Sequence, residues 1–170
     1  AHVVQEGIAE VRGHFAVSAN AYGVSLEPAL AAVVAEGGAG ETRAEPGEAD
    51  VYLPGCATLA ERPAAAAGFL KALAVRGIDG VVTTPASAAC CGLPLLWAGD
   101  VVGFRAHAER FAARLAGARR VIVHDAACAE ALGRRYADFG VTFAPQVITA
   151  LAFLVEKLGV EVDEAARPPE

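Results

Sequence analysis

The chain has 170 residues, of which 55% are hydrophobic, so it is long enough to bury the core of one domain. Its 14 basic and 20 acidic residues give a net charge of −6, and no basic cluster accompanies its three tyrosines and one tryptophan. This composition argues against nucleic acid as a partner. The longest uncharged run, 81–99, contains two prolines and two glycines and therefore does not predict a membrane span.

The N-terminal part of the chain, 1–49, is expected to be an extension with a helix over about 26–35 and a linker rich in Gly, Glu and Pro. The folded domain is expected at 50–160, followed by a frayed tail over 161–170. Because the chain begins at Ala1 and contains no methionine, we expect it to be part of a longer protein.

From residue 50 onward, strand signals alternate with helix signals. The expected strands are 51–54, 80–84, 121–123 and 141–148, and the expected helices are 63–76, 100–117, 126–139 and 149–158. Pro63 suits a first helical turn, and Asp100 is a candidate helix cap. Four βα pairs predict an α/β fold with a Rossmann-like, open, mostly parallel sheet and flanking helices.

The only four cysteines follow three of these strands. Cys56 comes after the first strand, Cys90 and Cys91 come in the loop after the second, and Cys128 comes in the first turn of the helix after the third. In open parallel sheets, ligands bind outside the carboxyl ends of the strands. We therefore expect the four cysteines to form one site.

Two other interpretations of the cysteines fit less well. Buried cysteines with no chemical role are common, but here Gly or Pro stands beside three of the four, which indicates turns rather than element interiors. Disulfides are not needed to stabilise a core of this size, and the adjacent Cys90 and Cys91 are awkward to join to each other. Reduced thiolates and a cytoplasmic location are expected.

Soft thiolate ligands favour zinc or an iron–sulfur cluster over magnesium or calcium. Structural zinc sites usually draw on short C-x₂₋₄-C pairs, which this chain lacks, whereas iron–sulfur clusters take cysteines from separated loops. The spacing favours iron and sulfur, with zinc as the alternative.

These motifs resemble the cysteine-rich CCG domain of heterodisulfide reductase and of the iron–sulfur subunits of glycolate, lactate and anaerobic glycerol-phosphate oxidation systems. The resemblance covers about 50–160. It rests on Pro-Gly-Cys at 54–56, on Cys-Cys-Gly at 90–92, and on Asp-Ala-Ala-Cys at 125–128 where the family carries Cys-x-x-Cys.

Asp125 is the departure from that pattern, because it replaces the first cysteine of the family's pair. The family's five cysteines imply a noncubane cluster, whereas the four here, Cys56, Cys90, Cys91 and Cys128, are compatible with a cubane [4Fe-4S] cluster. Asp125 is expected to cap the helix that starts at Ala126, and it is also a candidate oxygen ligand.

The resemblance implies an electron-transfer module, a subunit or domain of an oxidoreductase rather than a complete enzyme, with a ferredoxin-like domain or subunit and a flavoprotein subunit as partners. A zinc-binding or metal-free structural domain is the alternative, and a metal-free thiol catalyst using Cys90 and Cys91 is the third. His124 is a weaker candidate ligand, and His107 is expected to be an exposed helical side chain. Trp97 is expected to shield the site from water.

Overall fold

The computed structural model describes the backbone of residues 2–38 and 41–159, and the side chains from Ile8 onward within those ranges. The expected tail, 161–170, lies outside these residues. No helix in the described part of the chain is long and apolar enough to cross a membrane.

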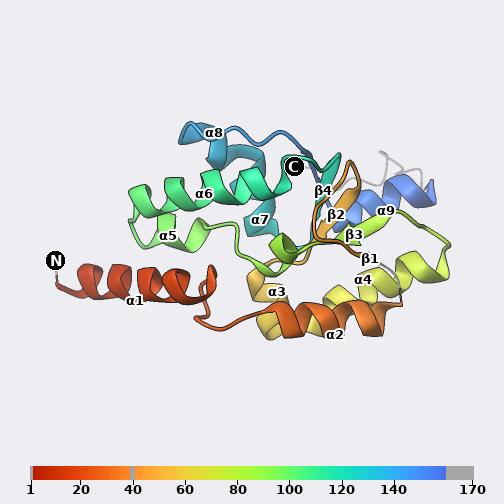
Figure 1. Cartoon of the computed structure of the whole chain (residues 1–170), viewed down its shortest axis with the longest axis horizontal. Helices are drawn as coiled ribbons and strands as arrows, with labels where there is room; N and C mark the ends of the chain where they lie inside the picture. The colour runs from red at the N-terminus through yellow and green to blue at the C-terminus, as the bar shows by residue number, and fades with distance from the viewer. Residues whose placement is uncertain (1, 39–40, 160–170) are drawn as a thin grey trace, which may run out of the picture.

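Five parallel strands form one sheet in the order β1-β3-β2-β4-β5, which confirms the predicted α/β fold (Figure 1). The strands are β1 (Glu41–Thr42), β2 (Asp50–Leu53), β3 (Val81–Thr83), β4 (Arg120–Val123) and β5 (Gln146–Thr149). All four predicted strands are present, and β1 is an additional edge strand within the stretch expected to be a linker. The central strands β2 and β4 pair over four residues and are almost entirely buried.

The predicted helices of the domain are present as well. They are α4 (Pro63–Val75), α6 (Val101–Leu115), the continuous segment made of α7 (Ala126–Glu130), the π turn η2 (Ala131–Arg135) and α8 (Tyr136–Asp138), and α9 (Ala150–Leu158). The helix expected over 26–35 is α2 (Glu27–Gly37). Four further elements were not predicted: α1 (His2–Ser18), α3 (Cys56–Glu61), the 3₁₀ turn η1 (Pro85–Ala88) and α5 (Leu93–Trp97).

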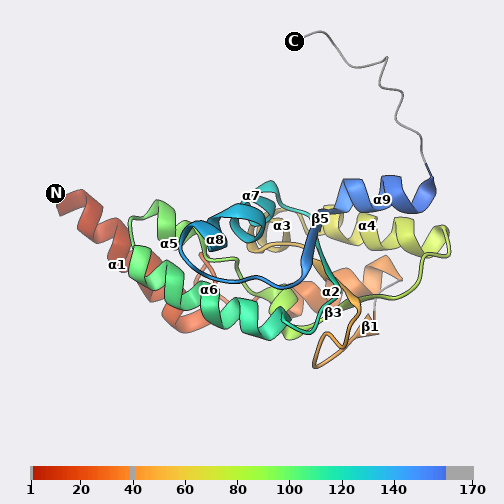
Figure 2. The same ribbon diagram turned by 90° about the horizontal axis from the view of Figure 1, so that it is seen from above.

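The helices cover both faces of the sheet. Figures 1 and 2 show α2 and α4 together on one face and α6 on the other. On the first face, the Phe69 ring of α4 packs on Tyr52 of β2 at 4.6 Å and on Phe153 of α9 at 6.4 Å between centroids. On the second, Phe104 of α6 packs on Tyr136 at 5.9 Å. Burial of these aromatic side chains is a main source of stability for the fold.

Side chains cap the helices α6 and α7. Asp100 accepts a hydrogen bond from the Gly103 amide at 2.9 Å, which confirms the expected cap of α6. Asp125 accepts one from the Ala127 amide at 2.8 Å, which confirms its capping role at α7. Each cap satisfies a backbone N–H that has no partner within the helix.

The residues before 50 pack closely against the rest of the chain. Strand β1 pairs with β3, and Arg12 of α1 forms an ion pair with the buried Asp100. Helix α2 lies so close to α4 that a Cβ on Gly37 would stand 2.5 Å from Leu70 Cβ. The N-terminal segment is therefore part of the structural environment of the domain.

Candidate functional site

The four cysteines lie in one cavity at the carboxyl edge of the sheet. Cys56 is the first residue of α3, Cys90 and Cys91 lie between η1 and α5, and Cys128 is in the first turn of α7. All four are buried, with at most 7% of any of them exposed. The cavity that they line together with Asp125 and part of α5 has a volume of about 70 Å³.

The strand order explains why these loops meet. Strand β3 follows β2 in the chain and lies on one side of it, while β4 lies on the other side. The loops after β2 and β4 therefore diverge at a topological switch point, where open α/β sheets form ligand-binding crevices. Cys56 follows β2 and Cys128 follows β4, so the cysteine site occupies this crevice.

The thiols contact one another directly. The Sγ atoms of Cys56 and Cys90 are 3.0 Å apart, and Cys91 lies close enough to Cys128 and Cys90 for both to shift its pKa. All four cysteines are free thiols. The site thus contains a connected set of four sulfurs rather than isolated core cysteines.

These contacts shift the pKa values of the four thiols in two directions. The hydrogen bond with Cys90 lowers the pKa of Cys56, and the hydrogen bonds with Cys128 and Cys90 lower the pKa of Cys91 well below its usual value. The same hydrogen bonds, together with burial, raise the pKa values of Cys90 and Cys128. The contacts among the sulfurs therefore shift their acidities in two directions, and the thiolate is the form that binds metal.

Two glycines allow the backbone to pass close to the sulfurs. Gly55 has φ 89° and ψ 148°, a conformation found essentially only in glycine, and a Cβ there would stand 3.2 Å from Cys128 Sγ. Gly92 has φ 87°, and a Cβ there would stand 2.7 Å from His107 Cδ2. The Pro-Gly-Cys and Cys-Cys-Gly motifs therefore each have a structural explanation.

Buried side chains of the helices hold the loop of Cys90 and Cys91. His107 Nε2 lies 2.7 Å from the Cys90 carbonyl oxygen, and the Tyr136 hydroxyl donates to the Cys91 carbonyl oxygen at 2.8 Å. The prediction that His107 is exposed is wrong, because it is only 6% exposed. Its position three residues after Phe104 and four before Phe111 placed it on the apolar side of α6, and this signal was missed.

The remaining candidates lie around the cavity. His124 is half-buried, and its Nδ1 lies 2.9 Å from the Tyr52 hydroxyl oxygen. Together with Asp125, it lines a separate pocket of about 360 Å³. Trp97 lines the cysteine cavity but is 70% exposed. Leu93 also lines the cavity and is almost fully buried, so it excludes water from this side more completely than the indole does.

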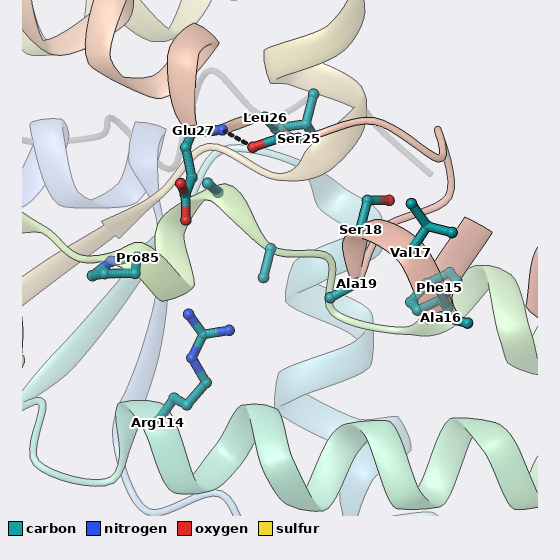
Figure 3. A pocket seen from close by; sticks show the side chains of 12 residues that line it. Phe15, Ala16, Val17, Ser18, Ala19, Ser25, Leu26, Glu27, Pro85 and Arg114 are labelled. Carbon is teal, nitrogen blue, oxygen red and sulfur yellow. Dashed lines mark hydrogen bonds between the residues drawn. The ribbon is translucent and has the colours of Figure 1, made fainter. Parts of the chain in front are cut away.

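A larger cleft of about 510 Å³ lies between the end of α1, the start of α2 and η1 (Figure 3). Arg114 extends from α6 toward this cleft, and Glu27 lies at its opposite wall. The cleft contains no cysteine or histidine, so its size does not make it a stronger candidate for metal chemistry than the cysteine cavity.

The donor set of the cysteine cavity suits a soft metal, but the sulfurs are closely packed. Among the described residues, no three His, Cys, Asp or Glu side chains are arranged to hold one metal ion. Two sulfurs bound to tetrahedral zinc at about 2.3 Å are about 3.8 Å apart. The 3.0 Å between Cys56 and Cys90 would therefore have to increase by about 0.8 Å.

Comparison of the chain with protein-family models, curated proteins and solved structures gave no match in any of the three. The resemblance to the CCG domain therefore rests on the three cysteine motifs of the sequence.

Proposed function

We propose that this chain is an iron–sulfur electron-transfer module of the CCG type. The observation that carries the proposal is the convergence of four buried thiols, from three loops, at the switch point of a parallel sheet. Soft ligands, exclusion of water and a position in a ligand-binding crevice are the properties that such a cofactor requires.

Cys56, Cys90, Cys91 and Cys128 would hold the cluster, and Asp125 would cap α7 beside it with one oxygen engaged by the Ala127 amide. When bound, a [4Fe-4S] cluster supplies one-electron chemistry. The protein contributes burial, which tunes the potential, and fixed loop carbonyls, which keep the ligands in place.

The function proposed for the module is to pass electrons between a flavoprotein or ferredoxin-like partner and a thiol, disulfide or quinone acceptor. Its place would be in the cytoplasm, as a subunit or domain of a larger oxidoreductase. Thiolate ligands of the proposed kind stay reduced in such a compartment.

Anaerobic reconstitution with ferrous iron and sulfide tests the proposal. We expect about four irons and four sulfides per chain, a broad visible absorption that bleaches on reduction, and loss of iron in C56S, C91S and C128S. Gly68→Ala, which changes an exposed position of α4 that does not line the cysteine cavity, is the control and should load like wild type. Stoichiometric zinc without iron or sulfide would overturn the proposal.

A zinc-binding structural domain is the second candidate, and the compactness of the site favours it. A cavity of about 70 Å³ corresponds to about two water molecules of liquid volume, and a single ion needs less rearrangement there than a cluster of eight atoms. In that case one zinc per chain should bind at the four cysteines and raise the melting temperature, with no redox couple. A reversible one-electron couple would contradict this candidate.

A further inference from the structure

Cys56 and Cys90 form a pair within the cysteine site. Their Sγ atoms are 3.0 Å apart, and both residues are free thiols. A disulfide bond requires about 2.05 Å between the sulfurs. An approach of about 1 Å would join them.

The backbones on both sides of this contact are fixed. The Cys90 amide donates to the Ala19 carbonyl oxygen at 3.2 Å, and the Cys90 carbonyl oxygen is bonded to His107. On the other side, the Leu59 amide donates to the Gly55 carbonyl oxygen at 3.0 Å and closes the first turn of α3 around Cys56. The two sulfurs are thus held in contact, which raises the rate of a reaction between them.

The other sulfurs are less suited to react with Cys56. Among the described residues, the 3.0 Å contact with Cys90 is the one sulfur–sulfur hydrogen bond of Cys56, and adjacent cysteines such as Cys90 and Cys91 rarely join each other. Cys56 is also the most exposed of the four, at 7%, so it is the sulfur that a small oxidant meets first.

We propose that Cys56 and Cys90 form an intramolecular disulfide when the metal-free protein meets a peroxide. The Cys56 sulfur attacks one oxygen of hydrogen peroxide, the O–O bond breaks, and Cys56 sulfenic acid and one water form. The Cys90 sulfur then attacks the Cys56 sulfur, the S–O bond breaks, and a second water leaves with the Cys90 proton. Two thiols are oxidised by two electrons, and one peroxide is reduced to two waters.

This disulfide would close the site to metal, because it removes two of the four thiolates. That consequence rests on the proposed function, whereas the disulfide itself does not. Oxidation and metal loading would then exclude each other, and reduction by a thiol would restore the site.

Tryptic mapping of the metal-free chain tests the disulfide. Trypsin places Cys56 in the peptide 44–71, Cys90 and Cys91 in 77–105, and Cys128 in 121–134. After one equivalent of hydrogen peroxide and alkylation under denaturing conditions, we expect the free thiols to fall from four to two. Peptide 44–71 should be joined to 77–105, and a reductant should separate them.

Fragmentation between residues 90 and 91 assigns the bond in the wild-type protein, so the test does not depend on a variant that folds. C91S should keep the crosslink, and C90S should lose it. A bond from peptide 44–71 to 121–134, a bond to Cys91, or sulfinic acid at Cys56 without any crosslink would overturn the proposal. None of these outcomes depends on whether the protein binds iron, so failure here and failure of iron loading are separate results.

Discussion

Replacing Gly55 by alanine should destabilise the protein, although it adds only one methyl group. The backbone of Gly55, at φ 89° and ψ 148°, is strained for any residue with a side chain, at a cost of about 1–3 kcal/mol. The new Cβ would also stand 3.0 Å from Asp125 Cβ and 3.2 Å from Cys128 Sγ, closer than the 3.5–4.0 Å of an ordinary carbon contact. Both effects act on the loop that presents Cys56.

Gly68→Ala is a matched control, because the same substitution should have the opposite sign. Gly68 lies inside α4 on its exposed side, and a Cβ there meets nothing within 4 Å. Alanine is preferred over glycine in a helix interior by about 1 kcal/mol. The two variants should therefore differ in free energy of unfolding by about 2–4 kcal/mol.

Thermal unfolding of the reduced, metal-free protein, followed by circular dichroism, measures this difference. For a chain of this size, 1 kcal/mol shifts the melting temperature by about 2–4 °C. Gly68→Ala should melt about 2–4 °C above wild type, and Gly55→Ala about 2–12 °C below it. If Gly55→Ala melts at or above the wild-type temperature, the backbone argument for the Pro-Gly-Cys motif is wrong.

Substitutions at three further positions test the contacts that support the fold and the site. Burial acts to raise the pKa of Asp50, but hydrogen bonds from its arginine partners Arg120 and Arg119 outweigh it, and the pKa is lowered. The stability that Asp50 contributes is therefore present above the ordinary Asp pKa of about 4 and is lost as the pH falls below it. At pH 7, Asp50→Asn should lower the free energy of unfolding by about 1.5–3 kcal/mol. Between pH 4 and 2, the variant should lose less stability than the wild type, as denaturant titrations at several pH values would show. An acid profile unchanged from that of the wild type would contradict the assignment. Tyr136→Phe leaves the buried Cys91 carbonyl without its donor and should cost about 1–3 kcal/mol in urea unfolding, whereas an effect within error would mean that water replaces the hydroxyl. Asp125→Asn keeps an oxygen that caps α7, whereas Asp125→Ala does not, so only the alanine variant should lose about 1 kcal/mol of stability. A loss of metal in the asparagine variant, with its stability unchanged, would assign the charge to ligation.

The alternation of apolar strands and amphipathic helices was sufficient to predict the sheet and to place all four cysteines at its carboxyl edge. Local capping chemistry also identified Asp100 and Asp125, because a cap depends on residues three positions away at most. The short strand β1 was missed because two exposed residues carry no periodic pattern, and only pairing with β3 defines them as a strand.

The contacts that support the site could not be predicted in the same way. Burial of Tyr136 follows from its helical stripe, but its hydroxyl reaches the Cys91 carbonyl, 45 positions away in the chain. His107 occupies an apolar stripe as well, and its ring nitrogen finds a partner only because the Cys90 loop crosses α6 at that point. Such pairings depend on how the loops cross, which periodicity within one element does not encode.

The Cys56–Cys90 contact itself depends on residues outside the cysteine motifs. The carbonyl of Ala19, just after α1, accepts the hydrogen bond of the Cys90 amide, and the Tyr22 hydroxyl donates to Glu61 at 2.6 Å. Glu61 is the last residue of α3, the helix that begins at Cys56. The turn between α1 and α2 is therefore bonded to both elements that carry the pair. A buried amide without a partner costs about 1–3 kcal/mol, so removing this turn would loosen the Cys90 loop even if every cysteine remained. The segment before residue 50 thus belongs to the same structural unit as the Cys56–Cys90 pair, although the motif resemblance begins only after it.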